Sequence, residues 1–286
     1  MVLCDDICRF LAGSGLGYEV GNIGGQDVIH VNDCAEILPM TVNSTSVEEA
    51  EKASEHLQIA IKKISEDTAR YPLIITEDRW HLQSKMMEAR LLAHLHIFTQ
   101  IYARNCEVRK IDKKTAADFL AENHSYGDAA CRHRYGLFLK RYTGHTSALN
   151  IDRPQAGDLV AVATFSNGRK WIKGDKTIRS YEWTRYASLP GVRLSGGMGK
   201  LLQAFIEEVK PDDIMTYADL EWSEGKVYEQ LGFTLEGMKS PVMFTVDVDS
   251  WRRKAHIGPD VTSGIPTRFF QNLGSNKYRL KLTDYQ

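Results

Sequence analysis

The sequence predicts a mixed α+β fold, in which a largely antiparallel sheet is flanked by helices and preceded by an N-terminal α+β domain. Two observations predict this class. The first third of the chain has two long stretches with apolar residues at helical spacing, and the middle third has short segments of alternating apolar and polar residues. A glycine cluster, an amphipathic helix and a strand–helix–strand order follow, which favours a mixed sheet.

Length and composition set the limits of the interpretation. The chain has 286 residues, of which 43% are apolar and 26% charged, so one or two soluble domains are expected. The net charge of −1 gives no global attraction to nucleic acid or membranes. Residues 1–70 carry 12 acidic and 5 basic side chains. The more positive remainder would suit an anionic ligand, or it reflects scatter in surface charge.

The expected organisation has three parts. Residues 1–104 form an N-terminal α+β domain, 105–248 form the main sheet domain, and 249–286 form a basic extension that packs back on a domain. This extension carries seven Lys and Arg against three Asp, and its segment Lys277–Leu282 is typical of a strand.

Cysteines and apolar runs indicate the compartment. The five cysteines at positions 4, 8, 34, 106 and 131 are odd in number and loosely spaced, which does not predict a disulfide framework. No second Cys or His pair completes a zinc site with Cys4 and Cys8, so no metal is expected. No run reaches the ~18 apolar residues of a membrane span, and the acidic N-terminus does not resemble a signal peptide. We therefore expect a cytoplasmic protein.

The first third of the chain predicts two helices around a short strand. Apolar residues at helical spacing predict a helix over 47–69, with an N-cap within Ser44–Ser46. Leu73–Thr76 predicts a buried strand, and 78–102 predicts a second long helix with apolar residues along one face.

The remainder predicts a strand meander followed by helices and strands. Asn167-Gly168 is a typical type I′ hairpin turn. Expected strands are 108–111, 135–140, 159–165, 170–172, 178–187, 214–218 and 242–248. Expected helices are 115–124, 196–209 and 223–231.

The most informative segment is the junction between the strand 178–187 and the helix 196–209. The first-turn N–H groups of a helix have no intrahelical partner and lie at the positive end of its dipole. Glycines there let a phosphate approach without meeting a Cβ, so the junction can bind a pyrophosphate, although such glycines are as often a simple turn. The candidate cofactor-binding residues are Arg193, Gly196, Gly197, Met198, Gly199 and Lys200.

This order of motifs resembles the GNAT superfamily of acyl-CoA-dependent N-acetyltransferases. The matching parts are the loop and helix at Arg193 and Gly196–Lys200, and the ending Tyr228-x-x-Leu-Gly-Phe233. The resemblance covers about 105–248. It implies that loop amides hold the pyrophosphate of acetyl-CoA or another acyl-CoA, that the next strand diverges to leave a slot, and that Tyr228 acts as general acid. The family's loop pattern fits either Arg193 or the glycine pair, but not both.

A narrower likeness joins the chain to the GNAT-like C-terminal region of phage homing-endonuclease-like proteins, and suggests a phage-related origin. It rests on Ile101–Cys106, Glu122–His124, Tyr217–Asp219 and the upstream Thr76–Trp80. Residues 1–70 contain no acidic and lysine strand motif of a metal-dependent nuclease, so nuclease activity is not expected.

An acyl transfer to an amine needs a proton acceptor and a proton donor. Glu182 or Glu221 is the candidate base, and Glu182 is alternatively a solvated residue or an ion-pair partner of Arg185. Tyr228 is the candidate acid, or a packing residue with a satisfied hydroxyl.

Three further side chains are candidates for the acceptor pocket. Tyr217 and Trp222 either line this pocket or belong to the core. Asp219 either binds the acceptor amine or caps the following helix.

The predicted function is therefore an acyl-CoA-dependent N-acyltransferase that acts on a small-molecule or peptide amine. The alternative is a non-catalytic GNAT-like module that binds a partner or nucleic acid, to which the basic run Arg252-Arg253-Lys254 would contribute.

Overall fold

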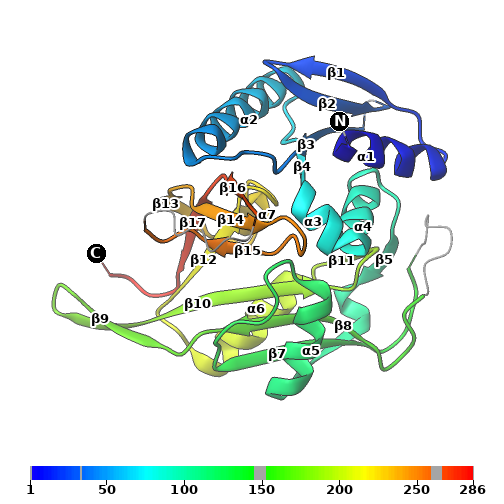
Figure 1. Ribbon diagram of the computed structural model, residues 1–286. Coiled ribbons are helices and arrows are strands. Elements are labelled where there is room, and N and C mark those ends of the chain that lie inside the picture. The colour runs from blue at the N-terminus through cyan, green and yellow to red at the C-terminus, as the bar shows by residue number, and fades with distance from the viewer. Residues whose placement is uncertain (1, 33, 145–152, 259–265, 286) are drawn as a thin grey trace. The chain divides into compact units, whose positions relative to one another are not determined.

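The computed structural model describes residues 2–32, 34–144, 153–258 and 266–285, and its chain divides into two compact units (Figure 1). This division differs from the three consecutive segments expected from the sequence, because the chain returns to each unit more than once. Unit 1 comprises Met1–Leu95, Ala218–Gly225 and Met238–Asn276, and unit 2 comprises His96–Tyr217, Lys226–Gly237 and Lys277–Gln286.

Unit 1 contains two small sheets. Its elements are α1 (Val2–Gly13), β1 (Glu19–Ile23), β2 (Gln26–Val31), β3 (Ala35–Met40), α2 (Val47–Thr68), β4 (Leu73–Thr76), α3 (Glu77–Leu82), α4 (Ser84–His94), β14 (Met243–Asp247), β15 (Arg253–Ala255) and β16 (Thr267–Gln271). The first sheet has the order β1-β2-β3-β4, with β3 and β4 parallel, and the second is antiparallel with the order β15-β14-β16.

Helix α2 matches its prediction. The Ser46 hydroxyl accepts a hydrogen bond from the Glu49 amide at 3.2 Å, and the helix ends at Ala69 in the left-handed region. Its buried stripe includes Leu57, Ala60 and Ile64, which pack in one core with residues of both sheets.

The predicted helix over 78–102 is wrong in its length and its end. Helix α3 stops at Leu82, because Gln83 leaves helical backbone geometry (φ −133°, ψ 37°), and α4 ends at His94. Residues Thr99–Tyr102 instead form strand β5, which pairs in parallel with β11. Pairing between distant segments overrides the local helical pattern here.

Unit 2 is built on one large sheet. Its elements are β5 (Thr99–Tyr102), β6 (Cys106–Lys110), α5 (Lys113–Asn123), β7 (His133–Leu139), β8 (Leu159–Phe165), β9 (Arg169–Lys173), β10 (Lys176–Ser188), β11 (Val192–Ser195), α6 (Gly197–Val209), β12 (Asp213–Asp219), α7 (Lys226–Gln230), β13 (Thr234–Lys239) and β17 (Ser275–Lys281). The ends of β12, β13 and β17 extend into unit 1.

The large sheet confirms the predicted fold class. Its order is β13-β17-β12-β10-β8-β7-β6, with β9 added on β10. The pairs β6–β7, β7–β8, β8–β10 and β9–β10 are antiparallel, whereas β10 and β12 are parallel. Helix α6 packs Phe205 on Phe165, with ring centroids 3.9 Å apart, and α5 packs Leu120 near Val162 on the opposite face. Helices thus flank a mixed, largely antiparallel sheet.

The expected hairpin turn at Asn167-Gly168 is wrong. Strands β8 and β9 both pair with β10, so these residues form an interruption between two strands that run in one direction. The turn is Gly174-Asp175, where Gly174 has φ 59°. Gly168 has a different reason to be glycine, because a Cβ there would lie 2.6 Å from the ring of Tyr181.

The C-terminal strand lies inside the sheet rather than on top of a domain. Strand β17, close to the predicted Lys277–Leu282, is inserted between β13 and β12. The predicted strand 242–248 is β14, which belongs to the three-stranded sheet of unit 1. Strands β13 and β17 are therefore neighbours in the large sheet, although β14, β15 and β16 lie between them along the chain.

Candidate functional site

The start of helix α6 presents unsatisfied backbone amides. Gly196 has φ 77°, and no side chain caps the helix among the described residues. The first intrahelical bond runs from the Lys200 amide to the Gly196 carbonyl at 3.0 Å. The amides of Gly197, Met198 and Gly199 thus have no helical partner and lie at the positive end of the helix dipole.

Three elements of unit 2 converge on this helix start. A Cβ on Gly197 would lie 2.5 Å from Cδ2 of Leu194, on β11, and 3.2 Å from the Tyr186 hydroxyl, on β10. A Cβ on Gly199 would lie 3.3 Å from Cδ2 of Leu231, just after α7. A Cβ at Gly197 or Gly199 would thus displace a leucine side chain, whereas the left-handed backbone at Gly196 itself favours glycine.

Beside the helix start, the two parallel strands separate. Strands β10 and β12 pair from Ser180 with Asp213 to Glu182 with Met215, although both continue further along the chain. The pairing of β10 with β8 is also irregular, between Trp183 and Arg185. The backbone pairing of β10 and β12 thus ends where the GNAT resemblance implies a slot for a thioester, and the Thr216 hydroxyl donates to the Trp183 carbonyl at 3.1 Å just beyond it.

Tyr228 lies among aromatic side chains next to this interruption. Its ring centroid is 6.1 Å from that of Trp183 and 5.7 Å from that of Phe233. Desolvation raises the pKa of Tyr228, against a smaller opposing effect of a hydrogen bond with Thr216. Burial and Tyr228 likewise raise the pKa of Tyr186. Both phenols therefore stay protonated at neutral pH. Sequence reasoning missed Tyr186, which has no motif of its own.

Glu182 faces away from Tyr228. Neighbouring residues of a strand point to opposite faces of the sheet, and Trp183 contacts Tyr228. The expected ion pair with Arg185 does not form, because the Arg185 guanidinium donates to the carbonyls of Gly127 and Thr184. The half-buried Glu182 carboxylate has no ion pair among the described residues.

The two candidate cations near the helix start differ in their freedom. The Lys200 ammonium donates to the carbonyls of Ala103, at 2.9 Å, and Cys106, at 2.7 Å, and thereby holds the start of β6 against α6. Arg193 is exposed, with its guanidinium 5.2 Å from the ring centroid of Phe98. Only Arg193 of the pair therefore keeps its charge available to a ligand.

The predicted acceptor-pocket residues fall in both units. Tyr217 is the last residue of its segment of unit 2, whereas Asp219 and Trp222 belong to unit 1. Asp219 does not cap the next helix, because α7 begins only at Lys226. Its carboxylate instead pairs with Arg79 at 3.3 Å.

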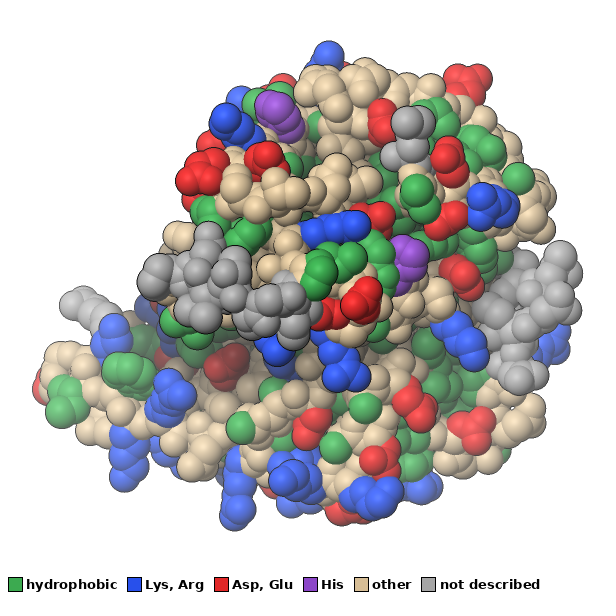
Figure 2. Space-filling view, viewed as in Figure 1, with side chains coloured by type: hydrophobic (Ala, Val, Ile, Leu, Met, Phe, Trp, Pro, Cys, Tyr) green, Lys and Arg blue, Asp and Glu red, His purple; other side chains and the backbone are tan. Residues whose placement is uncertain are grey.

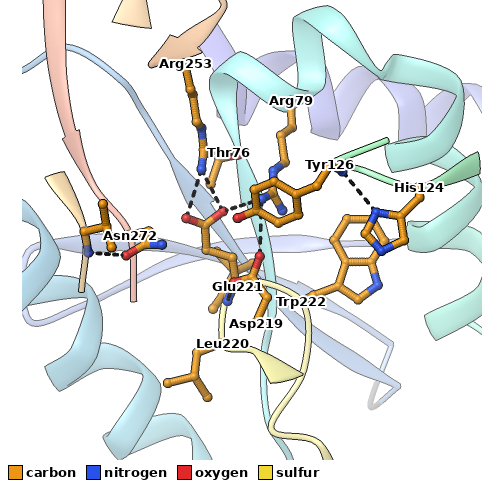
Figure 3. Close-up of polar contacts among 12 residues, drawn as sticks. Thr76, Arg79, His124, Tyr126, Asp219, Leu220, Glu221, Trp222, Arg253 and Asn272 are labelled. Carbon is orange, nitrogen blue, oxygen red and sulfur yellow. Dashed lines mark hydrogen bonds and ion pairs between the residues drawn. The ribbon is translucent and has the colours of Figure 1, made fainter. Parts of the chain in front are cut away.

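A buried charge cluster of unit 1 was not foreseen from the sequence (Figure 3). The Arg253 guanidinium donates to both oxygens of Asp78 and of Glu221, and to the Thr76 hydroxyl. Arg79 pairs with Glu221 at 3.2 Å. The Glu221 side chain is 1% exposed between two guanidinium groups, so the prediction that it could act as a base is wrong.

A third arginine fixes the segment that follows β12. The Arg90 guanidinium donates to the carbonyls of Ile74, Glu221 and Trp222, and lies 4.2 Å from the Trp222 ring centroid. Burial, with the nearby Arg79, lowers the pKa of Arg90 to about 9, so the group remains charged at neutral pH. Trp222 thus packs in unit 1 against arginine.

The described residues show neither a metal-ligand cluster nor a membrane-spanning helix. No group of three or more His, Cys, Asp or Glu side chains in this part of the chain is arranged to hold a metal ion. Nor does this part contain a helix of the length and apolar character needed to span a membrane.

Comparisons with known proteins add a weak structural likeness. No protein-family model matches the chain, and no curated protein matches it significantly in sequence. A conserved Enterococcus faecalis protein described as a probable N-acyltransferase is similar over 51% of this chain and 36% of its own length, at 13% identity and a TM-score of 0.35. This chain therefore spans about a third of that protein.

Two further similar structures are known. One is a histone acetyltransferase HPA2 and related acetyltransferase from Corynebacterium glutamicum, at 12% identity and a TM-score of 0.36, over 63% of this chain and 98% of that one. The other is a chain of the NatC complex bound to Gag peptide and CoA, at 11% identity and a TM-score of 0.35, over 63% and 99%. Scores of this size do not establish an activity.

Proposed function

We propose that this protein is an acyl-CoA-dependent N-acyltransferase, with its reaction centre in unit 2. One observation carries the proposal: the uncapped start of α6, the separating strands β10 and β12, and the Tyr228 phenol lie together. The first is suited to a diphosphate, the second is where the GNAT resemblance implies a slot for the thioester, and the third holds a proton that a departing thiolate needs.

Different residues around α6 would contact different parts of the acyl donor. The amides of Gly197, Met198 and Gly199 would hold the diphosphate, and Gly196 keeps their approach open. Exposed Arg193 would meet phosphate oxygens from outside, whereas Lys200 positions the segment before β6. The resemblance to the GNAT superfamily implies that β10 would hydrogen-bond the pantetheine arm.

The reaction forms an amide bond to the acceptor nitrogen and breaks a thioester. Acyl-CoA supplies the activated acyl group. Tyr228 holds the proton that the departing sulfur needs, and its raised pKa keeps this proton in place until then. Glu182, on the opposite face, would take the proton from the incoming amine, directly or through water. Alignment of two bound reactants supplies much of the remaining acceleration, up to about 7–11 kcal/mol.

The acceptor is an amine of a small molecule or peptide. Tyr217, in unit 2, stays a candidate for contacting it, whereas in unit 1 Asp219 neutralises Arg79 and Trp222 packs on Arg90. All five cysteines are free, as is usual in a reducing compartment, so we place the activity in the cytoplasm.

Calorimetric titration with acetyl-CoA tests the proposal. We expect saturable binding, together with a rise in the melting temperature, because a ligand that binds only the folded state stabilises it. Native mass spectrometry of freshly purified protein should detect CoA. The absence of both heat and thermal shift at millimolar acetyl-CoA would favour the alternative, a GNAT-like module without catalysis.

A further inference from the structure

The β9–β10 ribbon of unit 2 is an exposed, positively charged arm. Residues 169–179 contain five Lys and Arg and one Asp. Every residue of β9 is exposed, and the ribbon extends beyond the rest of the sheet (Figure 1). The guanidinium of Arg169 and the ammonium groups of Lys170 and Lys173 have no ion pair within the described residues. This concentration of charge is absent from the chain as a whole, which has a net charge of −1.

A half-exposed tryptophan, opposite the buried Ile178 on the neighbouring strand, lies between these cations. Trp171 is 53% exposed, and its ring contacts no other aromatic ring in the described part of the chain. Because residues two apart share a face of a strand, Trp171 lies between Arg169 and Lys173, each about 7 Å away. Lys176 lies opposite Lys173 on the neighbouring strand and shares this face. Figure 2 shows Lys and Arg side chains beside hydrophobic ones at the free end of the ribbon, at the left.

A hollow of about 780 Å³ extends the charged surface from the tip of the ribbon to the C-terminal residues. Its charged and aromatic lining residues are Lys173, Lys176, Lys281, Asp175, Asp284 and Tyr285. The Lys281 ammonium lies 4.7 Å from the Tyr285 ring centroid. In the hollow, as on the ribbon, a Lys side chain therefore lies beside an aromatic ring.

We infer that the β9–β10 ribbon binds single-stranded nucleic acid. Cations along the ribbon would neutralise phosphates, and the exposed face of Trp171 would stack on an unpaired base, a combination typical of surfaces that bind single strands. A membrane surface fits less well. Trp171 and the 81% exposed Ile172 are neighbours on one strand, so they point to opposite faces and form no single apolar patch that could enter a bilayer.

Fluorescence anisotropy with labelled oligothymidylate and oligouridylate tests the inference in the intact protein. We expect binding at low ionic strength that weakens steeply with salt. The triple variant R169Q/K170Q/K173Q should make the negative slope of log K against log salt shallower by about 2, because each phosphate contact on a single strand contributes about −0.7. W171A should weaken binding about tenfold through the loss of stacking.

A matched control removes the same charge elsewhere. The variant K52Q/K62Q/K63Q replaces three exposed lysines of helix α2 and should leave both affinity and slope unchanged. Quenching of tryptophan fluorescence by the oligonucleotide should disappear in W171F.

Three results would overturn the inference. They are the absence of binding at low salt, an equal effect of the two triple variants, and binding to anionic phosphatidylserine vesicles without binding to either oligonucleotide. Thermal melts of all variants separate loss of binding from loss of fold. The test is independent of acyl-CoA binding.

Discussion

The buried charge cluster of unit 1 makes a sharp prediction for the variant Arg253→Met. Arg253 donates to both oxygens of Asp78 and of Glu221, whose side chains are 2% and 1% exposed, and to Thr76. Removing one partner of a buried ion pair leaves the others uncompensated, which costs about 3–5 kcal/mol. Methionine retains the apolar packing of the arginine stem over Phe270, where the guanidinium now lies 4.0 Å from the ring centroid.

The effect should also depend on pH. Burial acts to raise the pKa of Asp78, but hydrogen bonds and the charge of Arg253, with Arg79 and Thr76, outweigh it and leave the pKa below its ordinary value of 3.8. A carboxyl group with a lowered folded-state pKa stabilises the fold above its unfolded pKa, and this contribution is lost as pH falls through the folded value. The difference between wild type and Arg253→Met should therefore be full at pH 7 and shrink below about pH 4.

The assay is urea unfolding followed by tryptophan fluorescence, since urea does not screen charges as guanidinium chloride does. The neighbouring Arg252 is exposed, and Arg252→Met should change stability by less than about 0.5 kcal/mol. Arg253→Lys keeps the charge but not the forked geometry of the guanidinium. Its free energy of unfolding should be about 2 kcal/mol below that of the wild type. Equal stabilities of the two methionine variants, or a difference independent of pH, would refute the reasoning.

Three further predictions concern unit 2. Tyr228→Phe should lower the rate of thiol release from acetyl-CoA about 100-fold, the usual loss for a general acid, with unchanged calorimetric affinity; an unchanged rate would remove the role of the phenol. Lys200→Met should destabilise the protein by about 2 kcal/mol in urea, because it leaves two carbonyls without their charged donor. Hydrogen bonds from Arg279, then Lys277, lower the pKa of Glu236 to about 2 despite partial burial. Thermal stability should thus fall from about pH 4.5 toward 2, and less so in Glu236→Gln.

Local patterns predicted those elements whose structure depends on local sequence. Helix α2 has its N-cap and apolar stripe within one segment, and α6 follows its glycines, so both were predicted closely. Strand β8 has the predicted bounds, but Val160–Phe165 are all buried rather than alternating, because both faces of the sheet are covered by helices. Strand β5 was missed because its partner β11 is remote in sequence, and β13 was missed because all its residues are exposed and give no burial pattern.

The candidate site was predicted in part for the same reason. The glycine loop and Tyr228 carry a local motif, so sequence alone could place them. The partners of Arg79 and Arg253 lie 140 and 175 residues away along the chain, and no local pattern indicates such pairing. Tyr186 has no sequence motif, and only the position of its hydroxyl beside the start of α6 makes it a candidate.

The most direct test of diphosphate binding at the start of α6 is the CoA affinity of Ser195→Asp against Ser195→Asn. Ser195 is exposed just before Gly196, and its hydroxyl accepts a hydrogen bond from Gln100 at 2.9 Å, which either substitute can accept. A carboxylate there favours the helix dipole, so the fold should persist, but it repels a diphosphate. We predict that calorimetry gives at least about tenfold weaker CoA binding for Ser195→Asp, a difference of about 1.4 kcal/mol, and near wild-type binding for Ser195→Asn. Equal affinities of the two variants would contradict the proposed site.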